Sequence, residues 1–293
     1  MRPVVGILIL LLLPVWTSGT GTEADTPRAA IVGSVFDYVV RDGDTLARIS
    51  ARFGVDARPI RRMNQLGPAA RLEPGTSITI DNRHIAIVPA GVRILINVPQ
   101  RMLFLADDDR VTGYPVGLGQ QDWPTRVGPF TVTKLETNPV WDVPASLQAE
   151  MKREGRPVIE HMPPGPENPL GAHWIGLSLP NFGIHGTIAP LSVYRFASHG
   201  CIRMHPDDVA EVFSNVTVGA PGAIVYAPVV AAVFEGRVFL EAHPDVYKRA
   251  SDAEQILRDA AWSDGFSTRV DWARASRVLA DRDGIAVDVT SPD

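Results

Sequence analysis

The chain has 293 residues, of which 45% are hydrophobic, and its formal net charge is −5. This length suits one large domain with a smaller one or two modest domains, and the apolar content is enough for a folded core. The sequence contains no basic stripe, so a nucleic-acid partner is not expected. The 25 glycines and 25 prolines favour a fold of strands and loops over a helical bundle.

The first residues have the pattern of a secretory signal peptide. Arg2 supplies a positive charge, an apolar run spans residues 4–13, and small residues then lead to Ala24. The apolar run is short for a membrane span, although an uncleaved membrane anchor is the alternative. Residues 1–24 are therefore predicted to be a signal peptide, which places the mature protein in the periplasm or elsewhere in the cell envelope.

The next part of the chain is predicted to be a linker followed by a small module. Residues 25–36 are mostly small and are expected to form the linker. Residues 37–82 are expected to form a βααβ unit, whose first helix is capped by Asp44 or Thr45 and stops at Gly54. A second helix and a closing strand follow.

The same module resembles a LysM domain. The resemblance rests on these residues: Tyr38-Val39-Val40, Gly43-Asp44-Thr45-Leu46, Ile49, Phe53-Gly54, Asn64 and Pro74-Gly75. It implies that the module binds glycans containing N-acetylglucosamine, which here means peptidoglycan. A unit that only packs against its neighbour is the alternative.

The central part of the chain is predicted to be mainly β. Residues 84–135 consist of short apolar or alternating runs separated by Pro, Gly and Asp, without helical periodicity, which indicates a sandwich or barrel-like sheet. Residues 136–180 are predicted to be long loops, of which a part is either a flap over a site or an ordered surface excursion. Residues 228–293 are predicted to be an α+β C-terminal extension with a hairpin around Glu235-Gly236, and the sequence assigns this extension no chemistry.

Cys201 is the only cysteine in the chain, so it cannot form an internal disulfide. A free thiol is unusual in an exported protein, and an inert buried cysteine is the alternative. The polar and glycine-containing neighbours of Cys201 favour a reactive thiol. Two histidines are candidate bases: His185, which ends a predicted strand 16 residues upstream, and His199, two residues upstream.

His185 is predicted to be the general base, because a strand-end imidazole can approach the thiol squarely, whereas a side chain two residues away in a turn often points elsewhere. The carbonyl group of Gly186 is expected to orient the His185 ring. Gly200 is expected to permit a sharp turn and to leave nearby amides free for an oxyanion. An activated Cys201 would react with iodoacetamide well below the ordinary thiol pKa of about 8.5.

These residues form a paired motif that resembles the L,D-transpeptidase (YkuD-type) catalytic domain. Ile184-His185-Gly186-Thr187 is followed by Ser198-His199-Gly200-Cys201-Ile202-Arg203-Met204, and Asn168-Pro169-Leu170-Gly171 is a supporting match. The resemblance extends over residues 90–227. One departure is Asp122-Trp123-Pro124-Thr125, which stands where this family more often has Thr-Pro.

The resemblance implies an acyl transfer on peptidoglycan that needs no cofactor. Cys201 would cleave the bond between the L-centre of a diamino acid and the terminal D-alanine of a stem tetrapeptide. The acyl group would pass to the amine of a second stem peptide or to a lysine of a lipoprotein acceptor. The resemblance also places Ser198, His199 and Arg203 around the substrate or the loop, with Arg203 pairing with a substrate carboxylate or holding the loop.

Three alternatives remain at this point. The same Cys–His pair could pass the acyl group to water, which would make the protein an L,D-carboxypeptidase. A wall-binding protein without catalysis would need residues 37–82 alone. A metal site would draw on Cys201 with histidines, but no H-E-x-x-H or C-x-x-C spacing is present and no metal is predicted. The histidines considered for that site are His161, His173, His185, His199 and His205.

Overall fold

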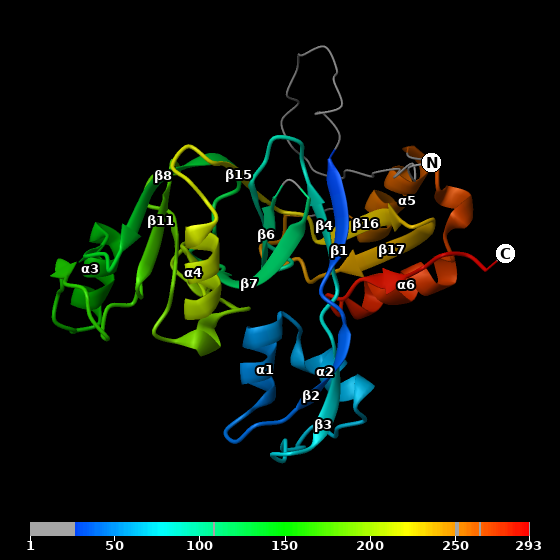
Figure 1. Ribbon diagram of the computed structural model, residues 1–293, viewed down its shortest axis with the longest axis horizontal. Helices are drawn as coiled ribbons and strands as arrows, with labels where there is room; N and C mark the ends of the chain where they lie inside the picture. Colours follow the sequence, from blue (N-terminus) through cyan, green and yellow to red (C-terminus); the bar gives the residue numbers. More distant parts are fainter. Residues whose placement is uncertain (1–26, 108, 250–251, 264, 293) are drawn as a thin grey trace, which may run out of the picture.

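The computed structural model describes residues 27–107, 109–249, 252–263 and 265–292. The predicted signal peptide lies outside the described residues. Figure 1 shows a central β body, a small module in blue and cyan beneath it, and an orange and red C-terminal body at its side. Within the described residues, no helix is long and apolar enough to cross a membrane.

The small module has the predicted βααβ order. The hydroxyl group of Thr45 accepts a hydrogen bond from the amide of Arg48 at 3.2 Å and caps the first helix, which ends at Gly54 in the left-handed conformation (φ 69°). The two strands pair antiparallel, and one hydrophobic cluster fills the space between strands and helices. The elements of the module are β2 (Val35–Val39), α1 (Leu46–Phe53), α2 (Ala57–Met63) and β3 (Ser77–Asp81).

The prediction of a linker at residues 25–36 is wrong. A strand, β1 (Arg28–Val32), lies there and pairs antiparallel with β4 (His84–Val88), while β2 begins at Val35. The Ala-Ala-Ile-Val run of β1 is too short to indicate a strand by itself. Its partner β4 is buried along its whole length and supplies the hydrogen bonds that make this run extended.

The central body is a closed, barrel-like sheet, as the predicted mainly β fold required. Its strand order is β13-β7-β14-β12-β11-β8-β15-β5-β6, and β6 also pairs with β7, which closes the sheet. Inward-facing aliphatic side chains from these strands form the largest hydrophobic cluster. The strands are β5 (Ile94–Asn97), β6 (Met102–Ala106), β7 (Val111–Gly119), β8 (Gly128–Thr137), β11 (His173–Leu177), β12 (Gly183–His185), β13 (Phe196–Ser198), β14 (Ile202–Met204) and β15 (Pro221–Val225).

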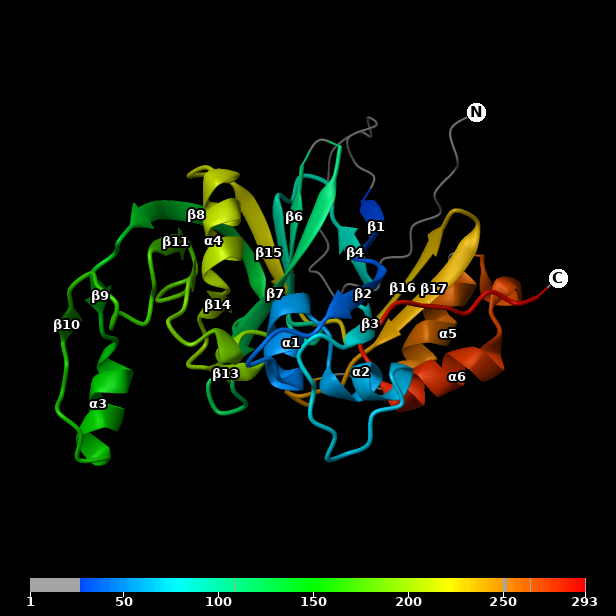
Figure 2. The ribbon, with the colours of Figure 1, turned by 60° about the horizontal axis from the view of Figure 1, so that its bottom comes forward.

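The segment predicted as long loops contains regular structure. It holds a short strand pair, β9 (Trp141–Asp142) with β10 (His161–Met162), and the helix α3 (Ala145–Arg153) between them. Both ribbon views show this arm extending away from the sheet (Figures 1 and 2). Two further elements cover the barrel: the 3-10 helix η2 (Pro190–Ser192) and the helix α4 (Pro206–Ser214), which packs against β11.

The C-terminal extension is α+β, as predicted. Its hairpin turns at Glu235 and Gly236, which both have positive φ (47° and 80°), as a two-residue hairpin turn of the primed type requires. The elements are β16 (Val229–Phe234), β17 (Arg237–Ala242), α5 (Ala253–Ser263), η3 (Ser267–Arg269), α6 (Trp272–Asp281) and β18 (Val287–Asp288).

Ion pairs fix the LysM-like module against both neighbouring bodies. The guanidinium group of Arg101 makes two contacts with the Asp56 carboxylate, at 3.1 and 2.7 Å, and lies 3.9 Å from the centre of the Tyr194 ring. On the other side, Arg58 contacts Asp283 of the C-terminal extension at 2.6 Å. Because Arg101 is only 8% exposed, its two-pronged contact resists solvent screening better than a surface pair does.

Candidate active site

The strand register brings His185 and Cys201 to one face of the barrel sheet. β12 and β14 run parallel, with Ile184 opposite Ile202 and His185 opposite Arg203. Ile184 and Ile202 are fully buried in the core. Because side chains alternate along a strand, their neighbours His185, Arg203 and Cys201 face the other side. Cys201 directly precedes β14, so it lies diagonally across the strand pair from His185.

His185 is held in one orientation and kept neutral. Its Nδ1–H donates to the carbonyl oxygen of Gly186 at 2.6 Å, and the ring stacks on Trp174 at 5.7 Å between centroids. Burial lowers the pKa of His185 to about 4; the Gly186 carbonyl offsets only part of this effect, and the positive charge of Arg203 adds to it. Near neutral pH the ring is therefore an unprotonated base whose free nitrogen is Nε2.

Trp174 is a member of the site that the sequence did not reveal. It lies opposite His185 on the neighbouring strand β11, and its indole covers Gly183. A Cβ atom at Gly183 would approach the indole ring to 2.3 Å, so only glycine fits there. The pair explains why the strand before His185 begins with glycine: the ring that stacks on the base needs that space.

The Cys201 thiol is partly exposed and is not ionised in advance. Its Sγ lies 3.7 Å from the carbonyl oxygen of Asn181. Burial raises the pKa of the Cys201 thiol above its ordinary range, and the Gly183 backbone and the Arg203 charge offset only part of that rise. This direction is opposite to the low thiol pKa expected from the sequence, because packing around the sulfur outweighs the nearby positive charge.

Two hydroxyl groups shape the turn that carries Cys201. Ser198 Oγ donates to the Cys201 carbonyl at 2.6 Å and accepts from the Gly200 amide at 3.1 Å. The fully buried Thr125 donates to the Gly200 carbonyl at 2.8 Å and accepts from the Gly119 amide at 2.9 Å. Thr125 belongs to the segment that departs from the family pattern, and its hydroxyl group still reaches the turn.

These bonds define what the predicted loop residues can do. Gly200 has φ of 111°, which favours glycine. Its amide is already bonded to Ser198, so a role for this amide in an oxyanion hole requires that bond to be exchanged. Ser198 is 1% exposed, so its hydroxyl group acts within the loop.

His199 and Arg203 lie around the turn with different partners. His199 Nε2 contacts the Glu150 carboxylate of α3 at 2.9 Å, and its ring lies edge-on to Trp123. The arm of residues 138–170 is therefore tied to the turn that carries Cys201. Arg203 is partly exposed on the same face as Cys201, and its Nη1 lies 3.5 Å from the Ala197 carbonyl oxygen.

Asn168 organises the loop above His185. Its side-chain amide donates to the carbonyl oxygens of Pro139 (3.0 Å), Met162 (3.3 Å) and Pro163 (3.2 Å), and its carbonyl oxygen accepts from the Leu170 amide (2.9 Å). The Leu170 carbonyl in turn contributes to the hydrogen-bonding environment of His185. The Asn-Pro-Leu-Gly segment noted in the sequence thus packs against Gly186, which directly follows His185.

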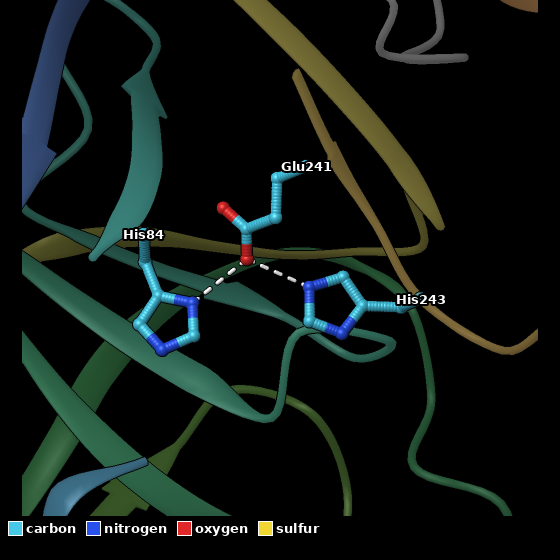
Figure 3. Close-up of side chains that lie close together, drawn as sticks. All are labelled: His84, Glu241 and His243. Atoms are coloured by element: carbon cyan, nitrogen blue, oxygen red, sulfur yellow. Dashed lines mark hydrogen bonds and ion pairs between the residues drawn. The ribbon is translucent and has the colours of Figure 1, made fainter. Parts of the chain in front are cut away.

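A second histidine cluster joins residues that the sequence left unassigned. His84 of β4, Glu241 of β17 and His243 lie together and are nearly inaccessible, at 1%, 0% and 2% exposure (Figure 3). One Glu241 oxygen contacts His84 Nδ1 and His243 Nε2, each at 2.7 Å, and the other accepts from the Ile85 amide at 2.6 Å. His84 Nε2 lies 2.7 Å from the Gly54 carbonyl oxygen. This triad links all three bodies of the protein.

The hydrogen-bond partners determine the charge of the triad. A carbonyl and a carboxylate only accept, so both nitrogens of His84 donate and its ring is an imidazolium. Burial opposes this charge, but Glu241 outweighs it and raises the pKa of His84. Burial likewise opposes ionisation of Glu241, yet the two rings lower its pKa to about 2. Burial lowers the pKa of His243, whose Nδ1 has no partner among the described residues.

The three side chains are types that bind metals, but in the described structure the Glu241 carboxylate already contacts His84 Nδ1 and His243 Nε2, and His84 Nε2 contacts the Gly54 carbonyl. The histidines weighed as ligands from the sequence are dispersed. His161 contacts Asp142 at 2.7 Å, the ring of His173 packs on Phe213, and His205 lies 3.5 Å from a carboxylate oxygen of Asp207. Spacing alone could not indicate the triad, because 157 residues separate His84 from Glu241.

Comparison with known proteins agrees with this architecture. The family model of the L,D-transpeptidase catalytic domain matches residues 91–230, and that of the LysM domain matches residues 38–81. The chain is 29% identical over 267 residues to a protein of Escherichia coli K12 named as the L,D-transpeptidase YcfS, covering 87% of this chain and 83% of that protein.

Two further likenesses were found. A Bacillus licheniformis protein named as the L,D-transpeptidase YkuD is 32% identical over 184 residues, which cover 62% of this chain and 94% of that protein. The crystal structure of L,D-transpeptidase 3 from Mycobacterium tuberculosis aligns with a TM-score of 0.37 and 13% identity, over 68% of this chain and 98% of that one. The chain thus combines a LysM domain with a YkuD-type catalytic domain. It belongs to the L,D-transpeptidase family.

Proposed function

We propose that this protein is an exported L,D-transpeptidase with Cys201 as nucleophile and His185 as general base. It cleaves the bond between the L-centre of a diamino acid and the terminal D-alanine of a stem tetrapeptide, and it transfers the acyl group to an amine. The observation that carries the proposal is the register of β12 and β14, which sets an oriented imidazole on the same sheet face as the only cysteine.

The protonation states of His185 and Cys201 suit a reaction that starts from a neutral imidazole and a protonated thiol. His185 donates through Nδ1 to Gly186, which leaves the Nε2 lone pair available for a proton. A pKa of about 4 keeps this ring unprotonated near neutral pH. Because the pKa of the Cys201 thiol is raised, its proton leaves as the sulfur attacks and not before.

The reaction then balances with no cofactor. Sγ of Cys201 bonds to the carbonyl carbon while its proton passes to His185, and collapse of the tetrahedral intermediate breaks the C–N bond. His185 returns the proton to the departing D-alanine amine, leaving a thioester. An amine then attacks the thioester and gives its surplus proton to His185. The new C–N bond forms, and the Cys201 sulfur leaves with that proton.

The LysM domain and Arg203 are proposed to bind the substrate. The LysM domain holds the glycan of peptidoglycan, and Arg203, which has no carboxylate partner among the described residues, offers a guanidinium group for a substrate carboxylate. The acceptor is the side-chain amine of a second diamino acid, giving a 3→3 cross-link, or a lysine of an envelope lipoprotein.

Purified protein mixed with disaccharide-tetrapeptide tests the chemistry. We expect an acyl adduct on Cys201 by intact mass, release of D-alanine and formation of cross-linked dimer, all absent from Cys201→Ser. The control His161→Asn, whose imidazole is 69% exposed, should react normally. Tripeptide without dimer would identify an L,D-carboxypeptidase instead, and the absence of an adduct would refute the cysteine mechanism.

Export is tested separately. The full chain is expressed in a Gram-negative host, and the mature protein is recovered from the periplasmic fraction. N-terminal sequencing should show that residues up to about 24 have been removed. Recovery of uncleaved chain from the cytoplasm would overturn the proposed localisation.

A further inference from the structure

A wide groove separates the LysM domain from the catalytic domain. Its volume is about 820 Å³, whereas three other cavities of the described structure hold about 210 to 310 Å³. A groove of this size suits a bound segment of several residues. One wall consists of Tyr38, the loop after β2 and one face of α1, and the other consists of residues 188–191 with His205.

The walls of this groove are held in place by direct contacts. α1 packs against η2, and Arg52 of α1 contacts Asp208 of α4 at 2.8 Å across the domain boundary. Gly54 at the end of α1 packs so closely on the barrel that a Cβ there would lie 3.1 Å from the Met102 sulfur. The groove is therefore a feature of the assembled protein, and neither domain forms it alone.

The LysM wall carries cationic groups without carboxylate partners. The guanidinium groups of Arg41 and Arg48 are exposed, and among the described residues neither forms an ion pair. The carboxylate of Asp44, which also lines the groove, accepts from the Tyr38 hydroxyl at 2.7 Å and from the Arg41 amide at 2.8 Å. The Arg41 guanidinium lies 5.9 Å from the centroid of the Tyr38 ring. The wall thus presents two planar guanidinium groups, and each can bind one carboxylate through two parallel hydrogen bonds.

The catalytic wall is apolar at residues 188–191 and polar at His205. Ile188 and Leu191 are 49% and 45% exposed there, which is unusual for large aliphatic side chains on one short segment. Guanidinium groups opposite exposed aliphatic side chains are complementary to a peptide that has several carboxylates and small apolar side chains. A neutral sugar chain would leave both features unused.

The groove begins where the catalytic strands end. Ile188 follows His185 of β12 by three residues, and His205 follows Arg203 of β14 by two. Cys201 directly precedes β14, whereas His205 of the groove directly follows it. The three residues of the strand between them extend over about 10 Å. A peptide attached to Cys201 therefore leaves the groove open for a second one.

We propose that this groove binds the carboxylate-bearing stem peptide of the acceptor strand through Arg41 and Arg48. This inference rests on the proposed transpeptidase function. It assigns the LysM domain a second task beyond holding glycan: one wall of the acceptor site. The acceptor strand then approaches the thioester from the His185 end, where its amine meets the base.

Binding is tested with the Cys201→Ser protein, so that no turnover is needed. The probes are disaccharide-tetrapeptide, the same compound with its carboxylates amidated, and a peptide-free oligosaccharide. We expect Arg41→Gln/Arg48→Gln to weaken disaccharide-tetrapeptide at least about tenfold by calorimetry, since two charge-assisted contacts are lost. The amidated compound should bind the parent protein as weakly as this. Affinity for the oligosaccharide should not change.

The matched control is Arg71→Gln/Arg277→Gln, which removes two exposed charges outside the groove. Equal weakening by this control, or loss of oligosaccharide binding in the groove variant, would overturn the proposal. In the otherwise native enzyme, the groove variant should raise the KM for acceptor and leave the rate of Cys201 acylation unchanged. Failure of acylation in the native enzyme would refute the transpeptidase function and leave the binding result standing.

Discussion

His185 and His84 are both buried imidazoles, but the groups around them give them opposite charge states. His185 faces main-chain carbonyls and the Arg203 guanidinium, so burial prevails and its pKa falls to about 4. His84 faces the carboxylate of Glu241. The attraction of this carboxylate exceeds the same burial penalty, so the pKa of His84 rises. A buried histidine next to dipoles remains a neutral base, whereas one next to a carboxylate becomes half of an ion pair.

The difference separates the tasks of the two regions. A neutral ring on the same sheet face as a thiol suits the proposed mechanism, in which the ring accepts and returns protons. A charged ring locked between Glu241 and the Gly54 carbonyl cannot do so without breaking the junction of three bodies. We therefore expect changes at His185 to alter the chemistry, and changes at the triad of His84, Glu241 and His243 to alter stability.

The largest expected effect follows from His185→Asn. The asparagine amide can still donate toward the Gly186 carbonyl, but it cannot take a proton from the thiol. The rate of acyl-enzyme formation, measured by intact mass, should fall at least about a thousandfold. The free energy of unfolding in urea should change by less than about 1 kcal/mol. A rate within tenfold of the parent would remove His185 from the mechanism.

Glu241→Gln should give the reverse pattern. It leaves the His84 charge buried without its counterion, which costs about 3–5 kcal/mol of unfolding free energy. The acylation rate of the folded fraction should stay within about twofold. The exposed pair of Glu254 with Arg258 provides the control, since Glu254→Gln should cost less than about 0.5 kcal/mol. Similar losses in both variants would show that the triad has no special role.

The pH dependence of stability follows from the same triad. The pKa of Glu241 is lowered to about 2, so its contribution is present above the unfolded value near 4.5 and is lost as the pH falls toward 2. The pKa of His84 is raised, so its contribution is complete below about 6.5 and is lost as the pH rises through the folded value. Glu241→Gln should flatten both limbs of the stability curve measured by urea unfolding.

The proposed general base, His185, predicts a different pH profile. Only neutral His185 accepts the thiol proton, so the rate of Cys201 acylation should hold down to about pH 5 and fall tenfold per pH unit below the pKa of about 4. Alkylation by iodoacetamide, which needs the thiolate, should rise only at a pH above the ordinary thiol pKa of about 8.5. Rapid alkylation at pH 6 would show that the thiol is ionised in advance.

The smallest effect is expected from Thr125→Val, which keeps the shape of the side chain but removes its hydroxyl group. The Gly200 carbonyl and the Gly119 amide lose their partner inside the protein, at a cost of about 1–3 kcal/mol. Acylation should slow about tenfold as the turn before Cys201 loosens. Thr133→Val, at an exposed position of β8, is the control and should leave both quantities unchanged.

Local sequence patterns predicted much of the fold and the motif around Cys201. Thr45 and Gly54 mark the ends of a helix because capping acts within one turn. The short motif around Cys201 predicted this thiol as the candidate nucleophile because its glycine and polar neighbours act on the same turn. β1 was mistaken for a linker because its partner strand lies far along the chain, and Trp174 and Thr125 were missed because their contacts cross between strands.

By itself, the sequence determined the order of modules, the helix and turn boundaries and the identity of the thiol and its candidate base, since all of these depend on neighbouring residues. Only the tertiary structure decided the charge states and the contacts between bodies. Burial and long-range partners set them: the thiol pKa rises because of packing, and His84 is charged because Glu241, 157 residues away, packs against it. Free energies of this kind arise only when distant segments exclude water together.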